Sequence, residues 1–317
     1  MKNDKGPLVS IVILNYNGMK FADKCLTSVL NTRYHNFEVI FVDNASTDGS
    51  LEYAKKRFGK NRRLRFVVNN KNYGFAKGNN IGLRHAKGEY VVFLNIDTEV
   101  DPNWLTELVK VMGSDPTIGA AQSKLLTMND RKRIDACGLT LTPYGFFVER
   151  GSGEVDREQY DSAVEIFAAK GAAMAVKREV LEKVGPFDED YFIFAEEVDL
   201  CWRIWLAGYR VVLVPKSIVF HFGAGIIKTI WPQKSPPYWY KNTLMTFIKN
   251  ASTKTLLKML PPFLLVSFAG SIRHRRPFSF LRATAEVLVG FRNIYKKRAQ
   301  VQHLLRKMSD EEVLCMK

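Results

Sequence analysis

The chain has 317 residues, of which 46% are hydrophobic and 25% are charged, and 47 Lys and Arg against 32 Asp and Glu give a formal net charge of +15. A chain this apolar can bury enough surface to offset its backbone entropy, so the composition excludes wholesale disorder. The length allows one large or two modest domains of about 100 to 200 residues each. The four cysteines stand far apart without a CxxC pair, which argues against a zinc site or a disulfide framework and favours a reducing compartment.

The positive charge is unevenly distributed along the chain. Residues 1–226 hold 30 basic and 28 acidic side chains, whereas residues 227–317 hold 17 and 4, so the excess is +2 in the first region and +13 in the second. We therefore expect a catalytic domain over 1–226 and a basic, amphipathic helical region over 227–317. A basic region can indicate a nucleic-acid partner, but that interpretation does not account for the polar loops described next, and we expect no nucleic acid.

The first half alternates short apolar runs with amphipathic stretches, which is typical of strand–helix units around a mostly parallel sheet. The run at 9–14 ends in Asn-Tyr-Asn-Gly, without the cleavage pattern of a signal peptide, and predicts a first strand. Further strands are predicted at 37–42, 64–68 and 90–94. Helices are predicted at 21–30 and at 51–58, the second with Ser46 or Thr47 as its cap. A third helix is predicted after the segment 72–80 and ends at residue 86.

All four strands lead into polar loops, at 15–17, 43–44, 69–74 and 95–97. In an open α/β sheet, ligands bind at the carboxyl ends of the strands, so these loops predict the ligand-binding edge. Downstream, strands are predicted at 118–125, 166–176, 211–214 and 218–220. A loop is predicted at 142–165, and helices are predicted to start at 180 and 196.

The second region contains an apolar stretch at 256–272, interrupted by Lys258 and by Pro261 and Pro262. The charges on either side leave an uncharged run of only fourteen residues, 259–272. We interpret this run as too short to span a bilayer, because a spanning helix needs about 20 apolar residues. Arginines follow at 273, 275 and 276, and one helix is predicted over 280–307. An apolar segment flanked by cations is typical of an interfacial element on an anionic membrane. We therefore expect a peripheral protein on the cytoplasmic face of the cell membrane.

Several residues at the strand ends have side chains suited to catalysis or binding. Asn95 and Asp97 form an Asn-x-Asp pattern that suits Mg²⁺ or Mn²⁺, which take one or two carboxylates and leave other positions to water and phosphate; a turn or helix cap is the alternative. Asp43 could accept hydrogen bonds from a nucleotide base, or form an Asx turn. The glycines at 74, 78 and 82 could let the backbone approach a ligand or serve helix packing.

Three carboxylates, Glu196, Glu197 and Asp199, are crowded at a predicted helix start. The helix dipole favours acids there, but crowding also raises pKa values, which suits a general base. His221 follows the last predicted strand, and it could be a metal ligand, a phosphate partner or a structural residue.

Taken in order, these segments strongly resemble family 2 glycosyltransferases, and more narrowly the rhamnosyltransferase-like branch. The resemblance covers about residues 7–225 and rests on six motifs: VSIVILNYNG (9–18), FEVIFVDNASTDGS (37–50), NYGFAKGNN (72–80), LNIDT (94–98), GPFDE (185–189) and EEVDLCWR (196–203). It implies a GT-A fold, with a Rossmann-like, mostly parallel sheet, and an inverting transfer from a nucleotide-diphosphate sugar with Mg²⁺ or Mn²⁺.

The resemblance also implies roles for individual residues. The nucleotide sugar would be held by Asn15, Asn17, Asp43, Asn44, Asn72, Phe75, Gly78, Asn79, Asn95, Lys170 and Gly171, and the metal by Asp97 and His221. Glu197 stands where the family usually has its catalytic aspartate, with Glu196 and Asp199 as alternative bases. The extra methylene of a glutamate moves the carboxylate by about an ångström, and such a displacement can cost roughly 10²-fold in rate.

The expected reaction adds a sugar to a hydroxyl of a lipid-linked or cell-surface glycan precursor, with dTDP-rhamnose and a UDP-sugar as candidate donors. Two alternatives stay open at this point. One is a catalytically inactive scaffold that binds nucleotide sugars, which the glutamate at 197 supports. The other is a sugar nucleotidyltransferase, although its early Gly-rich signature is replaced here by Asn15-Tyr16-Asn17-Gly18.

Overall fold

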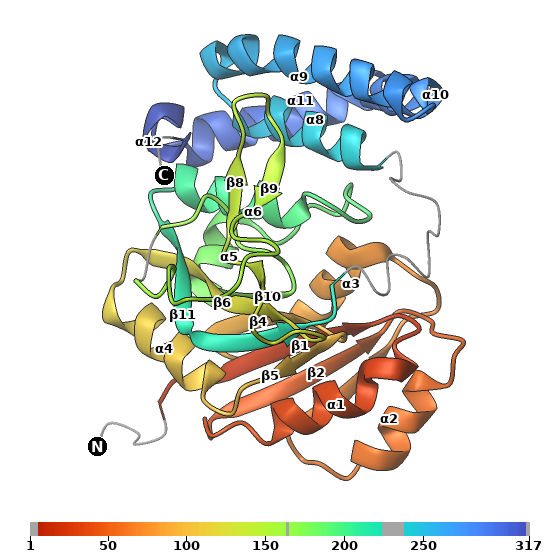
Figure 1. Cartoon of the computed structure of the whole chain (residues 1–317), viewed down its shortest axis with the longest axis vertical. Coiled ribbons are helices and arrows are strands. Elements are labelled where there is room, and N and C mark those ends of the chain that lie inside the picture. Colours follow the sequence, from red (N-terminus) through yellow and green to blue (C-terminus); the bar gives the residue numbers. More distant parts are fainter. Residues whose placement is uncertain (1–5, 163–164, 224–237, 315–317) are drawn as a thin grey trace.

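A computed structural model describes residues 6–162, 165–223 and 238–314, and within them the chain folds around one large mixed sheet (Figure 1). The strand order is β3-β2-β1-β4-β10-β6-β11-β5, and β7 pairs with β6. The strands are β1 Val9–Asn15, β2 Phe37–Asp43, β3 Leu64–Val68, β4 Tyr90–Asn95, β5 Thr98–Val100, β6 Ile118–Thr127, β7 Ile134–Ala136, β10 Ala173–Lys177 and β11 Arg210–His221. A separate hairpin joins β8 Leu139–Leu141 to β9 Phe147–Glu149. The predicted α/β class is confirmed.

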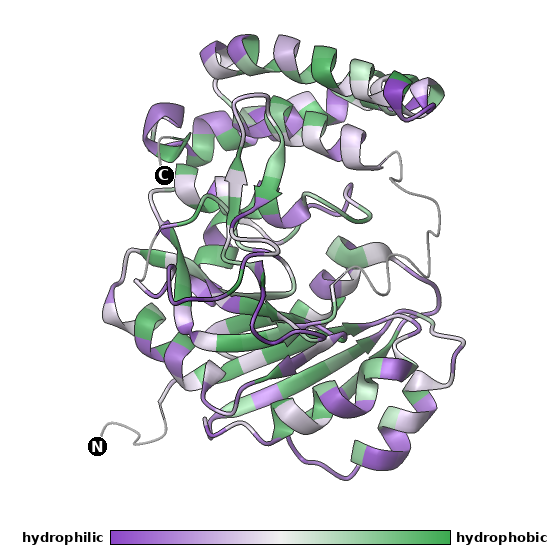
Figure 2. Ribbon diagram, viewed as in Figure 1, coloured by the Kyte–Doolittle hydropathy of each residue, from purple (hydrophilic) through white to green (hydrophobic). Residues whose placement is uncertain are grey.

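Strands β1 to β4 are parallel, as the alternating pattern of the first half predicts. They consist largely of hydrophobic residues (Figure 2), because both faces of the sheet are covered by helices. One face packs against α1 Met19–Leu30, α2 Ser50–Phe58 and α4 Trp104–Ser114. The other packs against α3 Gly74–Leu83, α5 Arg178–Val184 and α6 Glu196–Leu206. Strand β1 pairs with β2 on one side and with β4 on the other, so the order of the strands across the sheet reverses at β1. Open α/β sheets bind ligands beside such a reversal.

Several predicted elements differ from the structure, and one of them is the loop predicted at 142–165, which contains β9. Helix α2 starts at Ser50 after Gly49 and has no side-chain cap, because Ser46 instead bonds to Asn15 and to the backbone N–H of Asn17. Of the strand predicted over 166–176, only β10 is a strand of the sheet, because the chain turns at Gly171 and Ala172 just before it. The two strands predicted after residue 210 are one strand, β11, with an irregularity between Val214 and Ile218.

Three of the four cysteines lie within the described residues. Cys25, Cys137 and Cys201 are free and buried, and burial raises the pKa of each thiol to about 12. Cys315 lies outside the described residues.

The C-terminal region is a group of helices stacked on α6, with α9 and α10 outermost, at the end of the molecule opposite α1 and α2 (Figure 1). The helices are α8 Tyr238–Asn250, α9 Thr253–Arg273, α10 Pro277–Val289, α11 Phe291–Gln300 and α12 Asp310–Leu314, with a π-helical turn at Val301–Leu305. The single helix predicted over 280–307 is divided at Gly290. The predicted boundary at 226/227 lies outside the described residues.

The prediction that the apolar segment is too short to span a membrane is wrong. Helix α9 continues through Lys258, Pro261 and Pro262 for 21 residues, so it is about 30 Å long, close to the thickness of a bilayer's hydrocarbon core. By length and composition it could cross a membrane, with a mean hydropathy of 1.5, and only 22% of its most apolar window is buried. Counting uncharged residues in the sequence excluded the residues before Met259, whereas the helix includes Lys258 and both prolines.

Candidate active site

The carboxyl ends of β1, β2 and β4 meet at one edge of the sheet, as predicted. Asn15 is paired in register with Asp43 on β2, and Leu14 with Asn95 on β4. The amide of Asn15 donates to Oδ1 of Asp43 over 2.8 Å, and both side chains are buried. The polar residues that end these strands therefore form one connected group.

A cavity of about 400 Å³ opens at this edge. Ten of the residues predicted for the site line it, and they come from β4, β11, α3, α6 and the connecting loops. They are Asn44, Asn72, Phe75, Asn95, Asp97, Lys170, Gly171, Glu196, Glu197 and His221. The structure thus brings together residues that are spread over most of the first 226 positions.

Three predicted nucleotide-binding residues, at the ends of β1 and β2 and in the loop after β1, stand beside the cavity without lining it. Asn15 and Asp43 bond to each other, and Oδ2 of Asp43 accepts from the backbone N–H of Ser46. Asn17, in the left-handed region with φ of 53°, accepts from the N–H of Thr47 through its side-chain oxygen. These bonds fold the loops after β1 and β2 against each other.

The Asn72–Asn79 segment has a lining part and a supporting part. The amide of Asn44 donates to the carbonyl of Gly74 over 3.0 Å and to Oδ1 of Asn72 over 3.1 Å. Gly78 lies behind the cavity, where a Cβ atom would stand 2.6 Å from the Leu14 side chain. Asn79 is buried, and its amide donates to the carbonyl of Phe75 over 3.0 Å. Gly78 therefore serves close packing of α3 on β1, and Asn79 supports the helix start.

Asp97 and His221 lie side by side in the cavity wall. Nε2 of His221 is 3.4 Å from Oδ1 of Asp97, and Nδ1 is 2.9 Å from Oδ2 of Asp135 on β7. Burial lowers the pKa of His221, but its hydrogen bonds with Asp135 and Asp97 raise it to about 9. Without a metal, the two carboxylates thus stabilise a positive charge on the histidine between them, and a cation bound at Nε2 would displace the proton from that nitrogen.

This arrangement fits a divalent cation bound by Asp97 and His221. A metal-binding histidine commonly bonds to a carboxylate through its other ring nitrogen, which fixes the ring orientation, and Asp135 occupies that place here. Within the described residues, no group of three or more His, Cys, Asp or Glu side chains has the geometry of a complete metal centre. The protein would therefore supply two ligands and leave the others to diphosphate and water, as is usual for Mg²⁺.

Glu196 and Glu197 stand at the first turn of α6. One carboxylate oxygen of each is buried and has no hydrogen-bond partner among the described residues. Burial and the neighbouring Glu197 raise the pKa of Glu196 well above its usual value. Burial raises the pKa of Glu197 to about 7, and its side chain is the less buried of the two. A carboxylate with a pKa near 7 and a free oxygen at a cavity is suited to general-base catalysis.

Asp199, the third predicted base, lies outside the cavity and pairs with two cations. Its carboxylate is fully buried and lies 2.8 Å from Nζ of Lys249 and 3.0 Å from the guanidinium of Arg203. Although burial raises the pKa of Asp199, Lys249 and Arg203 lower it below the usual value. Asp199 does not line the cavity, and its two cations make it the weakest of the three candidates for the base.

Lys170 provides positive charge in the cavity wall. Its ammonium is 2.7 Å from Asp135 and 2.8 Å from Glu149. Burial lowers the pKa of Lys170, but these two carboxylates raise it above the usual value. Lys170 therefore stays protonated and links the metal side of the cavity to the β8–β9 hairpin.

Sequence reasoning missed several residues of this site. Asp135 and Glu149 lie on short strands without a recognisable motif, and the segment Phe192–Phe194 lines the cavity between two recognised motifs. Tyr16 also lines it, and its position within the Asn-Tyr-Asn loop was an available signal. Asp135 and Glu149 could not be found from one sequence, since isolated acids on short strands resemble surface charges.

The model of the glycosyl transferase family 2 matches residues 10–185, more than half of the chain. The chain belongs to this family. The resemblance stated from the six motifs is confirmed at that level, and the family membership removes the grounds for the nucleotidyltransferase alternative.

Similar curated proteins come from bacteria. An uncharacterized protein, y4gI, of Sinorhizobium fredii is 30% identical over 227 residues, covering 68% of this chain and 24% of that protein. A poly-beta-1,6-N-acetyl-D-glucosamine synthase of Staphylococcus epidermidis is 25% identical, covering 71% and 52%. An O-antigen biosynthesis protein, RfbC, of Myxococcus xanthus is 28% identical, covering 68% and 17%. The chain thus spans between about a sixth and about half of the length of these relatives.

Solved structures share the fold. GalNAc-T7 with UDP, GalNAc and Mn²⁺ has a TM-score of 0.62 at 19% identity, covering 78% of this chain and 48% of that chain. The mannosyltransferase PcManGT from Pyrobaculum calidifontis, with GDP-Man and Mn²⁺, has a TM-score of 0.54 at 19% identity, covering 94% and 85%. TarS of S. aureus with UDP-GlcNAc has a TM-score of 0.58 at 16% identity, covering 92% and 81%. The expected GT-A fold is confirmed.

Proposed function

We propose that the protein transfers a sugar, with inversion, from a nucleotide-diphosphate sugar to a hydroxyl of a lipid-linked or cell-surface glycan precursor. One observation carries this proposal. A single cavity holds Asp97 and His221, suited to a cation and diphosphate, together with the unpaired carboxylate oxygens of Glu196 and Glu197. A cation-binding pair and a carboxylate of suitable pKa are the two parts that a single displacement at the sugar carbon needs.

The roles of the chain's own residues follow from their charges. Glu197 removes the proton from the acceptor hydroxyl as that oxygen attacks C1 from the face opposite the leaving diphosphate. Lys170 keeps a positive charge in the wall, which favours an anionic leaving group. When bound at Asp97 and His221, Mg²⁺ or Mn²⁺ would neutralise charge on the diphosphate. One displacement inverts the anomeric centre.

The choice of donor and acceptor is the finer part of the proposal. The relatives include a poly-N-acetylglucosamine synthase and an O-antigen biosynthesis protein, and the fold neighbours were solved with UDP, UDP-GlcNAc or GDP-Man. These names support a nucleotide-sugar donor and a surface-polysaccharide product. The rhamnosyltransferase-like branch is supported by the O-antigen relative alone.

We propose an anionic bilayer, on the cytoplasmic side, as the partner of the face formed by α9 and α10. Large apolar side chains are exposed along it: Leu257, Leu265, Phe268, Ile272, Phe278, Leu281, Leu288 and Val289. Arg273 and Arg275 are exposed at the turn between the two helices. Apolar side chains beside cations complement the interface of an anionic membrane, which is also where a lipid-linked acceptor would be found.

The other face of α9 favours an interfacial helix over a spanning one. Its buried residues, Met259, Phe263, Ser267 and Ser271, recur every four positions and form one stripe. Phe263 packs on Phe247 of α8, with ring centroids 5.6 Å apart. A helix fixed lengthwise to the protein in this way lies along the membrane surface.

A panel of nucleotide sugars tests the activity, using the full chain with Mn²⁺ or Mg²⁺, thermal shift for binding and nucleoside diphosphate release for turnover. We expect one donor to raise the Tm and to be turned over only with the divalent ion. Binding without turnover or transfer to any acceptor would favour the inactive scaffold. Failure to bind any nucleotide sugar would overturn the proposal.

A further inference from the structure

The two carboxylates proposed for catalysis follow an unusual piece of backbone. Phe194 and Ala195, directly before Glu196, have φ values of 75° and 66°. Both are non-glycine residues in the left-handed region, which is unfavourable for side chains with a Cβ atom. Such conformations persist only where the surroundings impose them, and they occur often at functional sites. This turn sets the direction in which α6 starts and therefore where Glu196 and Glu197 point.

Asn242 on α8 holds this turn from the C-terminal side. Its amide nitrogen donates to the carbonyl of Ile193 and to the carbonyl of Phe194, each over 2.8 Å. The side chain is fully buried. Both amide hydrogens are thus used on the two carbonyls that precede the left-handed residues, and Ile193 and Phe194 themselves line the cavity.

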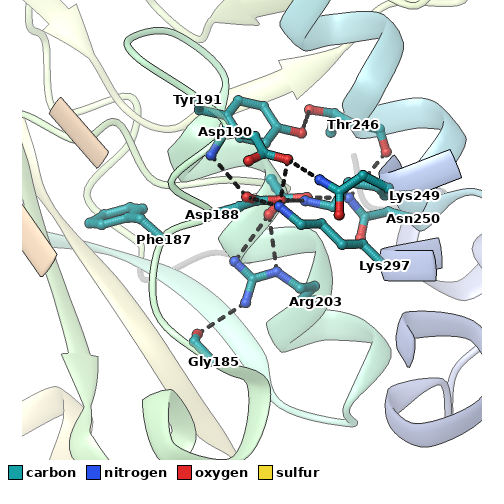
Figure 3. Close-up of polar contacts among 12 residues, drawn as sticks. Gly185, Phe187, Asp188, Asp190, Tyr191, Arg203, Thr246, Lys249, Asn250 and Lys297 are labelled. Atoms are coloured by element: carbon teal, nitrogen blue, oxygen red, sulfur yellow. Dashed lines mark hydrogen bonds and ion pairs between the residues drawn. The ribbon is translucent and has the colours of Figure 1, made fainter. Parts of the chain in front are cut away.

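The same face of α8 contacts the rest of the loop before α6. Residues 242, 246, 249 and 250 recur at helical spacing and are all buried. The hydroxyl of Thr246 is 2.8 Å from that of Tyr191, and Lys249 pairs with Asp188 (Figure 3). Polar groups that are buried and bonded across two elements define one arrangement, since any other would leave them unpaired.

The opposite side of the turn is held by the donor-binding loop. The backbone N–H of Phe75 on α3 donates to the carbonyl of Phe192 over 2.6 Å. A Cβ atom at Gly74 would stand 2.3 Å from the same carbonyl oxygen, so only glycine allows this approach. The segment 192–195 is therefore held between α3 and α8.

We propose that Asn242, from the C-terminal region, is a positioning residue for the catalytic carboxylates. By holding the carbonyls of Ile193 and Phe194 it keeps the turn before α6 in the conformation that directs Glu197 into the cavity. The expected effect on kcat rests on the proposed transfer reaction, whereas the expected effect on the backbone of residues 192–195 does not.

The test compares Asn242→Ala with Thr243→Val in the full chain. Thr243 is the adjacent buried residue of α8, and its hydroxyl has no hydrogen-bond partner among the described residues, so its replacement by valine controls for a change within the same helix. Asn242→Asp preserves the volume but replaces the donating group with an acceptor oxygen, and it serves if Asn242→Ala is too unstable to purify. Two measurements are made on each variant.

The first measurement is steady-state kinetics. Asn242→Ala should lower kcat by about 10- to 100-fold, as a displacement of about an ångström can. Because Asn242 bonds to the carbonyls of Ile193 and Phe194 and to none of the residues proposed to bind the donor, the KM for the donor should stay within about two-fold. Thr243→Val should leave both unchanged. Equal kcat values for Asn242→Ala and the wild type would overturn the inference.

The second measurement is hydrogen exchange of peptides covering residues 191–200, which does not depend on activity. Asn242→Ala should exchange faster there than the wild type, and Thr243→Val should not. Unchanged exchange in Asn242→Ala would overturn the inference even if activity fell. Faster exchange in a protein whose wild type transfers no sugar would support the structural role of Asn242 and count against the proposed function.

Discussion

Lys249 on α8 and Asp199 on α6 form a buried ion pair, with 2.8 Å between Nζ and Oδ1. Both side chains are almost fully buried, at 2% and 0% exposure. The amide of Asn250 donates to the same carboxylate over 2.8 Å, and Arg203 pairs with its other oxygen. The C-terminal helices are therefore joined to the helix that bears Glu197 by charges inside the protein as well as by apolar packing.

The first prediction concerns this pair. Lys249→Met should lower the free energy of unfolding by about 3–5 kcal/mol, because it leaves Asp188 and Asp199 buried without their shared cation. In a chain of this size that corresponds to a fall in Tm on the order of 10 °C. Thermal unfolding followed by circular dichroism measures it.

Lys254→Met is the matched control, because Lys254 also forms an ion pair, with Glu311, but on the surface of the same region. Exposed pairs add little to stability, so the Tm should not change. Equal Tm values for the two variants would contradict the assignment of a structural role to the buried pair.

The part of the fold that could be predicted from the sequence is the part with a regular pattern. Strands β1 to β4 alternate with helices, and each ends in a polar loop, so the binding edge follows from topology. Asp97 and His221 were predicted as metal ligands from the family resemblance, since Asp97 stands in the motif at 94–98 and His221 follows the last predicted strand. The structure places them 3.4 Å apart.

The role of α8 could not be predicted in this way. Lys249 and Lys297 counted toward the +13 excess of the second region, which indicated a membrane-facing surface, but both pair with Asp188 (Figure 3). Asn242 has no signal in a single sequence, because its partners are backbone carbonyls. Charge composition locates cations along the chain but does not distinguish those that face a membrane from those that face buried acids.

The second prediction is that Glu197→Gln lowers the rate of sugar transfer by about 10²- to 10⁴-fold, the usual contribution of a general base. Donor binding, measured by thermal shift with the nucleotide sugar, should persist, because Asn44, Asn72 and Asp97 are unchanged. Glu196→Gln is the matched comparison, because it makes the same change at the neighbouring carboxyl group, whose pKa burial and Glu197 raise well above its usual value. If Glu196→Gln lost activity and Glu197→Gln kept it, the base would be Glu196.

The third prediction follows from the pKa of Glu197, which burial raises to about 7. The charged groups around it are Lys170, Glu149 and Glu196. Since the base must be deprotonated, the transfer rate should rise about tenfold per pH unit below 7 and level off above it. A rate already independent of pH at pH 5 would contradict this.

The same raised pKa has a consequence for stability. A carboxyl group whose pKa is higher in the folded than in the unfolded chain makes the free energy of unfolding fall as the pH rises from about 4.5 to about 7. Glu197→Gln removes that titration, so the variant should have a higher Tm than the wild type at pH 8 and a similar Tm at pH 4. Denaturation by heat at the two pH values measures the difference.

The fourth prediction concerns Asp135, which orients the ring of His221. Asp135→Asn should weaken Mn²⁺ binding by about 10- to 100-fold, because residues that orient a metal ligand commonly have effects of this size. Calorimetric titration with Mn²⁺ alone measures the Kd without requiring a donor. Asp130→Asn is the control, since Asp130 lies on the surface and pairs with Arg133, and a Kd unchanged in both variants would contradict the proposed ligand pair.

The fifth prediction tests the membrane face. Leu265 and Phe278 have 70% and 83% of their surface exposed on α9 and α10. Burying one such side chain contributes about 1.5–3 kcal/mol, so the double variant Leu265→Glu and Phe278→Glu should bind vesicles containing phosphatidylglycerol at least tenfold more weakly than the wild type. The double variant Val68→Glu and Val155→Glu is the control, because it introduces the same two charges at exposed apolar residues outside α9 and α10. Cosedimentation with vesicles measures binding.

The salt dependence and the mode of binding distinguish the remaining possibilities. If the arginines between α9 and α10 contribute, wild-type binding should weaken as salt is raised and on vesicles of phosphatidylcholine alone, because attraction to anionic lipid is screened by salt. Protein that stays with cell membranes after both alkaline and high-salt washes would indicate that α9 spans the bilayer, as its length allows. Undiminished vesicle binding by the double variant would show that this face is not the one that meets the membrane.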